Sequence, residues 1–304
     1  MRTIWFVYIG NYEYRDAVFD AYSEVNKYLA GNKFPIRLIF HVSNEIEKAA
    51  KDVVLELKPG FTIIIETGQG KVMAYSLEGI MDILYGWLVK TRHEVSEIYE
   101  IYYRKKKDKQ KGEGQGENLT KETIELEGKE SKIEETEKAE IKEETENMEK
   151  NNEETEKEEM HFEHLYGDEI PDTVIGVVSL PLVTRNPYLD FYEKFLGVQK
   201  QISGLNIMVV SASPFYHENK LIFSERLFKS ILHELGHAFG LNHCSENCVM
   251  NPPSTIEEWD SRIPDFCSKC FLELKRNVEW KANKRDNTSL QRGKEDRESS
   301  SRDT

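Results

Sequence analysis

The most constraining stretch of this sequence is HELGHAFGLNH, which runs from His233 to His243. His233 and His237 are four residues apart, so in a helix their side chains rise from successive turns on one face. That spacing suits two nitrogen ligands of one tetrahedral zinc ion. Glu234 stands beside the first histidine, where it can reach a metal-bound water without being a ligand. The stretch therefore predicts a helix that carries part of a metal site.

The residues that follow complete this prediction. Gly240 stands three residues beyond His237, where a helix can end in a left-handed turn that glycine adopts without strain. The chain can then double back and bring His243 to the same metal. Three imidazoles leave the fourth position of a tetrahedral zinc open, as in catalytic sites. Glu234 is then the expected general base, taking a proton from the attacking water and giving it to the departing amine.

All the cysteines of the chain follow this motif closely. They form a C-x-x-x-C pair and a C-x-x-C pair: Cys244, Cys248, Cys267 and Cys270. The spacing is close to that of four-cysteine zinc sites, which are closed and structural. A redox C-x-x-C or inert buried thiols are the alternatives, although a redox pair would leave the first two cysteines unexplained. Because neighbours in an extended turn point opposite ways, His243 and Cys244 can each serve a different ion.

Composition limits the classes of partner. The formal net charge is -14, and most of it lies between Gly112 and Met160. The rest of the chain is nearly neutral, so no basic face indicates a nucleic-acid or membrane partner. The apolar run near the N-terminus is too short for a signal segment or a membrane span, and four cysteines are too few for a disulfide scaffold. We therefore expect a cytoplasmic protein with reduced thiols.

Hydrophobic periodicity predicts an α/β fold with helices covering a mixed sheet. Apolar runs predict strands over residues 3–10, 36–42, 61–67, 172–180 and 205–213. Apolar residues at helical spacing predict helices over residues 15–30, 75–90 and 224–240, and residues 187–201 are expected to form a short helix or covering segment.

Domain boundaries follow from changes in composition. Residues 104–163 form a low-complexity, charged tract that cannot build a core, so we expect a disordered insertion there. Residues 281–304 are polar throughout and are expected to be a disordered tail. Because neither half holds enough strands or motifs to stand alone, we expect one domain over residues 1–280 that the insertion interrupts.

These residues resemble the pattern of the archaemetzincins, a family of metzincin-type zinc metallopeptidases. The family's extended histidine motif, the cysteine that follows it, a Cys-x-Met and a C-x-x-C are all present, and Met250 occupies the methionine position. Two spacers, Cys244 to Cys248 and Met250 to Cys267, are each about one residue shorter than is usual in the family. The match is strong only from Ser230 to Cys270.

The resemblance implies a fold and roles for individual residues. It implies a metzincin-like mixed sheet with an active-site helix and a zinc-stapled C-terminal segment. It implies two zinc ions, one catalytic and one structural, with Glu234 as proton acceptor and Met250 in the turn beneath the catalytic zinc. It also implies that Leu205–Ser211 is the edge strand that pairs with an extended peptide substrate.

The sequence thus predicts a zinc-dependent metallopeptidase acting on a peptide or protein. One alternative is a zinc-stabilised binding protein with little hydrolytic activity, which would have no use for Glu234. Another is a nucleic-acid module built on the cysteines, although from Ser245 to Phe266 there are five acidic residues and a single basic one, Arg262. A zinc hydrolase of a non-peptide amide also stays open. The natural substrate and the oligomeric state do not follow from the sequence.

Overall fold

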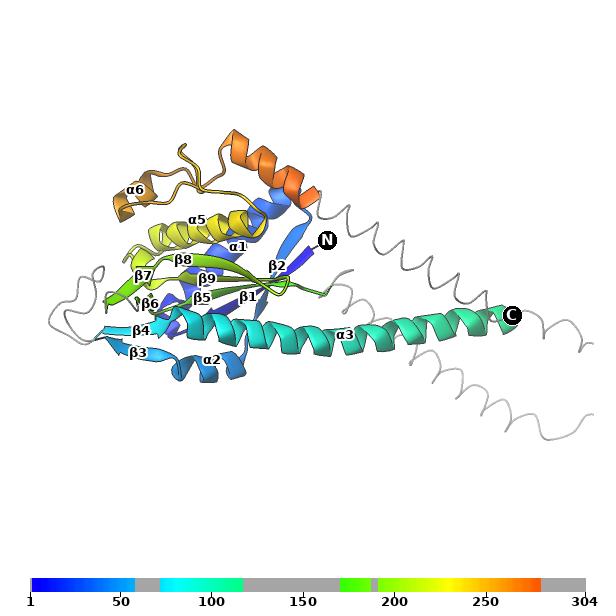
Figure 1. Cartoon of the computed structure of the whole chain (residues 1–304). Coiled ribbons are helices and arrows are strands. Elements are labelled where there is room, and N and C mark those ends of the chain that lie inside the picture. The colour runs from blue at the N-terminus through cyan, green and yellow to red at the C-terminus, as the bar shows by residue number, and fades with distance from the viewer. Residues whose placement is uncertain (1, 58–71, 117–169, 187–190, 280–304) are drawn as a thin grey trace, which may run out of the picture. The chain divides into compact units, whose positions relative to one another are not determined.

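The computed structural model describes residues 2–57, 72–116, 170–186 and 191–279 (Figure 1). The strand expected over residues 61–67, most of the charged insertion and the C-terminal tail lie outside these ranges. The described residues are divided between strands and helices, which confirms the α/β class.

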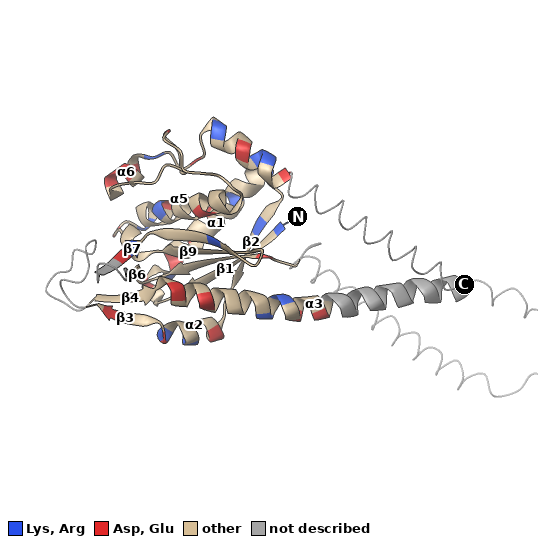
Figure 2. Ribbon diagram, in the orientation of Figure 1, with Lys and Arg blue, Asp and Glu red and all other residues tan. Residues whose placement is uncertain are grey.

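A five-stranded sheet organises the molecule, with strand order β2-β1-β5-β9-β8. Its strands are β1 (Arg2–Ile9), β2 (Ile36–His41), β5 (Thr173–Val178), β9 (Leu205–Ser211) and β8 (Gly197–Ile202). The first four pair in parallel, and β8 is antiparallel to β9. The parallel strands are almost uncharged (Figure 2), which is expected for strands buried on both faces. Four of the five expected strands are therefore confirmed.

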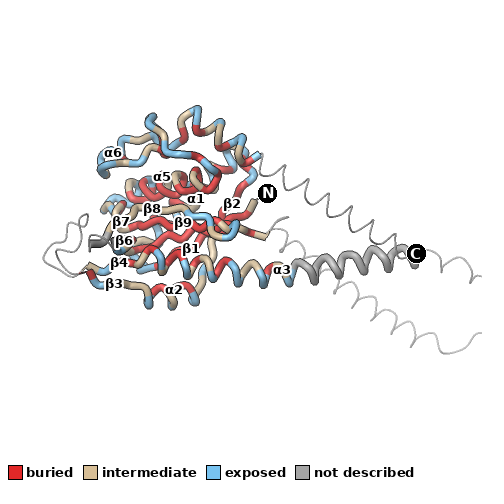
Figure 3. The backbone as a smooth tube through the Cα atoms, in the orientation of Figure 1, coloured by how far each residue is buried: buried red, intermediate tan, exposed pale blue. Residues whose placement is uncertain are grey.

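Alternate residues of β1 show how the two faces of this sheet are covered. Ile4, Phe6 and Tyr8 join the core formed by α1 (Arg15–Gly31) and α5 (Lys220–Ala238). Trp5 lies on the opposite face, where its ring contacts that of Trp87 at 5.1 Å between centroids. Trp87 belongs to α3 (Leu77–Gly116), and α2 (Asn44–Lys51) lies on the same side (Figure 1). The strands between these layers are buried (Figure 3).

A second sheet of four strands has the order β3-β4-β6-β7. Its strands are β3 (Val54–Leu57), β4 (Val72–Ser76), β6 (Leu182–Asn186) and β7 (Phe191–Phe195). Antiparallel pairs flank a central parallel pair, β4 with β6. The chain passes from β7 to β8, at the edge of the first sheet, through Leu196 alone.

The prediction of a helix or covering segment over residues 187–201 is wrong, because the described part of this segment forms β7 and β8. A tight turn explains β8. Ser203 and Gly204 both have positive φ, 49° and 81°, and they join β8 to β9 as the two central residues of a hairpin. Turns of this kind match the twist of the strands that they connect.

The same hairpin shows that the strand expected at the edge of the sheet is not an edge strand. Leu205–Ser211 pairs on both sides, with β5 and with β8, so it lies inside the sheet. The outer strand of the five is β8 instead. The expectation failed because periodicity marks a buried strand but does not show which neighbours flank it.

The helix expected over residues 75–90 extends much further, as α3, to Gly116. Its last residues lie inside the stretch expected to be a disordered insertion. Contacts divide the chain into two compact units, residues 1–89 with 171–304, and residues 90–170. The histidine and cysteine motifs both belong to the first unit. None of the described helices is long and apolar enough to cross a membrane.

Candidate metal centre

Helix α5 positions the first two histidines. Asn219 caps its N-terminus by accepting a hydrogen bond from the backbone N–H of Leu221, and apolar residues bury one side of the helix. His233 and His237 stand one turn apart, with their Nε2 atoms 3.0 Å from each other. The structure brings His243 to the same place, and the ligand nitrogens of all three histidines lie within 4.8 Å of one another.

Backbone carbonyls fix the orientation of two of these rings. Nδ1 of His233 donates to the carbonyl oxygen of Val249 at 2.7 Å, and Nδ1 of His237 donates to that of Leu241 at 2.8 Å. Each neutral ring then has a lone pair on Nε2, so two acceptors face each other at 3.0 Å. Such a pair is repulsive until a cation lies between them, and oriented Nε2 atoms are typical of zinc-binding histidines.

Burial favours the protonation state that a metal requires. It lowers the pKa of His233 to about 4, and it also lowers the pKa of His237. Both rings are therefore neutral near pH 7, which leaves Nε2 free to bind a metal.

The end of α5 explains how His243 returns to the site. Gly240 has φ +88°. Its N–H donates to the carbonyl oxygen of His237, and the next N–H, of Leu241, donates to that of Gly236, both at 2.9 Å. This is the Schellman arrangement, which needs a left-handed residue at Gly240. The turn also places the Leu241 carbonyl where it accepts from His237.

Glu234 is buried beside the histidines, and only 4% of it is exposed. Its Oε2 atom has no hydrogen-bond partner among the described residues. Burial raises the pKa of this carboxyl to about 8 in the protein without bound metal, and a divalent cation nearby would lower it again. A buried acceptor without a partner fits a site that a water molecule and a metal complete.

Met250 forms the packing surface beneath the histidine helix. It is fully buried, and its sulfur lies 2.3 Å from the position that a Cβ atom on Gly236 would occupy. The helix can approach the methionine this closely only because residue 236 has no side chain. Met250 is thus placed directly under the turn that carries His237.

The four cysteines also come together. Their sulfur atoms lie within 4.8 Å of one another, and those of Cys244 and Cys267 are 3.8 Å apart. Zinc–sulfur bonds of about 2.3 Å in a tetrahedron place two sulfurs about 3.8 Å apart. The backbone N–H groups of Cys267 and Met250 donate to the sulfur of Cys248 at 3.2 and 3.5 Å, as expected around a thiolate. All four cysteines are free of disulfides, and the set fits one closed metal site.

One short loop connects the two groups of candidate metal ligands. His243 belongs to the histidine group and Cys244, the next residue, to the cysteine group. The N–H of Cys244 donates to the carbonyl oxygen of Met250 at 2.9 Å, which closes the loop on itself. The same loop supplies the Val249 carbonyl that orients His233. Anchoring the cysteines therefore also fixes parts of the histidine site.

An ion pair between a buried arginine and a more exposed aspartate holds α5 against the segment that follows this loop. The guanidinium of Arg226 donates to both carboxylate oxygens of Asp260, at 2.7 and 2.6 Å. Asp260 belongs to α6 (Ile256–Ser261), and Trp259 in the same helix contacts the ring of His233 at 6.3 Å between centroids. The pair with Arg226 holds the pKa of Asp260 below its usual range.

Replacing Asp260 with asparagine is expected to destabilise the protein by about 2 kcal/mol at pH 7, because Arg226 loses a charged partner. Since the folded pKa of Asp260 is lowered, its contribution is present above the usual carboxyl pKa and is lost as pH falls through the folded value. The stability gap between wild type and variant should therefore narrow below about pH 4. Chemical denaturation at several pH values measures this, and a gap independent of pH would contradict it.

Sequence comparisons identify the family. The sequence model of peptidase family M54 matches residues 98–276, which is more than half of the chain. This chain belongs to peptidase family M54. The curated relatives that it matches are named archaemetzincins, so the resemblance seen in the motif is confirmed.

Two of these M54 relatives show the extent of the similarity. The archaemetzincin of Methanopyrus kandleri is 35% identical over 102 residues, which cover 29% of this chain and 58% of the relative. That of Thermococcus kodakarensis is 40% identical over 100 residues, covering 30% and 54%. The chain thus spans about half the length of the curated relatives it matches. The crystal structure of the M. kandleri protein aligns with a TM-score of 0.47 and 18% identity, covering 91% of this chain and 96% of that one.

One residue at the candidate site of this M54 chain, Gly197, was not predicted from the sequence. A Cβ atom placed on it would lie 2.3 Å from Oε1 of Glu234, so the first residue of the edge strand β8 lies directly against the carboxylate. Only a residue without a side chain allows this approach. The only signal in the sequence is a glycine at the start of a strand. Gly197 and Glu234 are 37 positions apart, so their contact cannot be inferred from the sequence around either residue.

Replacing Gly197 with alanine is expected to displace the carboxylate of Glu234, so that any peptide hydrolysis that depends on this carboxylate should fall roughly tenfold to a hundredfold in kcat/KM. Zinc content should stay unchanged. Peptide cleavage and elemental analysis measure the two quantities. Gly31 is the matched control, since a Cβ there meets nothing within 4 Å. Equal rates in the two alanine variants would contradict the placement of Glu234.

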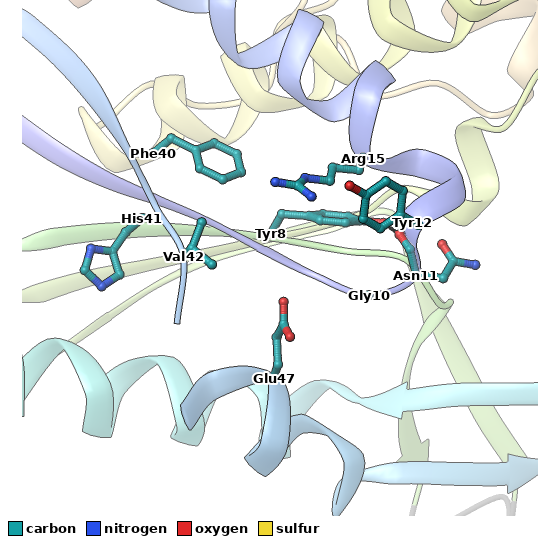
Figure 4. A pocket seen from close by; sticks show the side chains of 9 residues that line it. All are labelled: Tyr8, Gly10, Asn11, Tyr12, Arg15, Phe40, His41, Val42 and Glu47. Atoms are coloured by element: carbon teal, nitrogen blue, oxygen red, sulfur yellow. Dashed lines mark hydrogen bonds between the residues drawn. The ribbon is translucent and has the colours of Figure 1, made fainter. Parts of the chain in front are cut away.

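A cavity of about 300 Å³ lies at the carboxyl ends of β1 and β2 (Figure 4). Arg15 from α1 and Glu47 from α2 extend toward it from opposite sides, and Phe40 forms part of its wall. None of the predicted histidine, glutamate, methionine or cysteine site residues lines it. It is therefore separate from the candidate metal centre.

Proposed function

We propose that this chain hydrolyses peptide bonds at a zinc ion held by His233, His237 and His243. The observation that carries the proposal is the pair of Nε2 acceptors 3.0 Å apart, with the unpartnered Oε2 of Glu234 buried beside them. Membership of peptidase family M54 supports it. A zinc ion in this site would polarise a water molecule and the carbonyl group of the scissile bond.

Glu234 would move the proton in this reaction. Its carboxylate takes a proton from the attacking water and passes it to the nitrogen of the leaving amine. Burial keeps bulk water from competing for that proton. Gly197 packs against Oε1 while Oε2 has no partner among the described residues, so Oε2 is the atom available for proton transfer.

Strand β8 would position the substrate. Among the described strands it pairs with β9 alone, so its other edge can bind an extended peptide through backbone hydrogen bonds. Its first residue lies against Glu234, which brings a peptide on this edge next to the proton acceptor. This replaces the strand that the sequence had suggested for the role.

The cysteine group would bind a second zinc ion that takes no part in the chemistry. Four sulfur ligands close the coordination shell, so this ion stabilises the loop that carries Val249 and Met250. Met250 would support the histidine helix from below. Because the thiols must stay reduced to bind zinc, we also place the protein in the cytoplasm.

Two other functions compete with peptide hydrolysis. A zinc-stabilised binding protein is disfavoured because Oε2 of Glu234 is buried without a hydrogen-bond partner among the described residues. This burial costs stability, and such a protein would gain nothing from it. A hydrolase of non-peptide amides shares the same chemistry and differs only in its substrate. The edge of β8 that pairs with no other described strand favours a peptide.

The test is cleavage of a mixed peptide library, read by mass spectrometry, with the zinc-loaded protein and its His237→Ala variant. We expect cleavage by wild type, loss of cleavage on adding a chelator, and recovery on restoring zinc. The variant should cleave nothing and should lack one zinc ion. Cleavage that survives in the variant would contradict the proposal.

A further inference from the structure

A cavity of about 320 Å³ lies between the segment that leads into β8 and the segment that follows Met250. Its lining is mostly apolar and is drawn from three separate segments: Lys194, Leu196, Pro214, Phe215, Pro253, Ser254, Thr255 and Ile256. It is large enough for one amino-acid side chain.

Covalent neighbours place this cavity next to Glu234. Leu196 directly precedes Gly197, the residue that lies against the Glu234 carboxylate. Pro253 follows Met250 by three residues, so a second wall continues from the segment under the histidine helix. A third wall, at Phe215, contacts Trp259 at 6.3 Å between ring centroids, and Trp259 in turn contacts His233.

Lys194 supplies the charge of this cavity. The residue is partly buried, and burial lowers the pKa of its ammonium group. Within the described ranges no carboxylate forms an ion pair with it. Nearby acidic groups have other partners: Asp260 pairs with Arg226, and Glu258 accepts from the backbone N–H of Ser254. A partly desolvated cation without a counter-ion is costly, and an anionic ligand would remove that cost.

The direction of the substrate decides which side chain reaches the cavity. Antiparallel pairing is the more stable arrangement of two strands, and a peptide paired in this way with β8 runs from the Ile202 end toward the Gly197 end. Residues before Gly197, including Lys194 and Leu196, then lie along the part of the peptide that follows the scissile bond.

We propose that this cavity receives the side chain of the residue that follows the scissile bond, and that Lys194 selects aspartate or glutamate there. The inference rests on the proposed peptidase function and adds a substrate class to it. The apolar walls contact the methylene groups of the acidic side chain, and the Lys194 ammonium pairs with its carboxylate. Lys194 is therefore a specificity-determining residue.

The experiment compares matched peptides that differ only in having Glu or Gln after the cleaved bond. For the zinc-loaded wild type, we expect kcat/KM to be roughly tenfold higher for the Glu peptide, a preference that added salt reduces. In Lys194→Met the preference for the Glu peptide should disappear. In Lys194→Glu it should reverse, so that a matched peptide with Lys after the cleaved bond has a higher kcat/KM than the Glu peptide. Arg15→Met is the control, since it removes a cation that lines the other cavity, and it should keep the wild-type preference.

Binding gives a second readout that needs no catalysis. In the Glu234→Gln background, fluorescence anisotropy should show tighter binding of the Glu peptide than of the Gln peptide, and adding Lys194→Met should abolish the difference. If no peptide is cleaved but this difference is present, the proposed function fails while the acidic site stands. The inference is overturned if wild type cleaves and binds the Glu and Gln peptides equally well. It is also overturned if Lys194→Met keeps the preference for the Glu peptide.

Discussion

Replacing Glu234 with glutamine is expected to lower kcat for peptide cleavage about a thousandfold while the zinc content stays the same. Glutamine has nearly the same shape, so the histidine site keeps its geometry. It cannot accept the proton of the attacking water, however, and the buried position leaves no solvent base to replace it. Steady-state kinetics and elemental analysis of the two purified proteins measure the effect.

The control for this change lies on the same helix. Glu225 is half exposed, and its carboxylate pairs with the buried ammonium group of Lys229. Glu225→Gln should keep activity within about twofold of wild type, because Lys229 keeps its hydrogen bonds to the carbonyl oxygens of Trp259 and Arg262. If Glu234→Gln also kept more than a tenth of the wild-type rate, another group would have to be the base.

Replacing Cys267 and Cys270 together with serine is expected to remove one zinc ion and several kcal/mol of stability, because binding of a structural zinc is coupled to folding. Peptide cleavage should fall as well. The loop that these cysteines anchor carries the carbonyl of Val249, which orients His233, and it carries Met250. Thermal denaturation, zinc content and cleavage rate measure the three effects.

The two residues between these cysteines provide a matched control. Ser268 and Lys269 are both exposed, so replacing them with alanine should leave zinc content and melting temperature nearly unchanged. A cysteine variant that kept both zinc ions and melted like wild type would show that the thiols are not metal ligands.

The ligand groups were predictable because their geometry is local. Helical spacing fixes His233 and His237 on one face, and the single glycine after the helix turns the chain back toward His243. The cysteine pairs follow at once, so little of the fold is needed to bring them together. The structure gathers the residues into the two groups that the sequence suggested.

The surroundings of the site depend on contacts between distant segments and were not predictable in this way. The Ser203–Gly204 turn is a hairpin signal that could have revealed β8, but it gives no hint that Gly197 lies against Glu234. The same holds for the cavity beside it, whose walls come from residues 194–196, 214–215 and 253–256. Both the contact between Gly197 and Glu234 and the cavity depend on how remote segments pack together.

Zinc content per chain, measured by elemental analysis on three proteins, distinguishes two separate metal sites from one. We expect two zinc ions in the wild type and one in His237→Ala. We also expect one in the variant that lacks Cys267 and Cys270, where the remaining zinc is the one bound by the histidines. A single zinc ion in the wild type, or a His237→Ala protein that retains both, would contradict an arrangement of one open histidine site and one closed cysteine site.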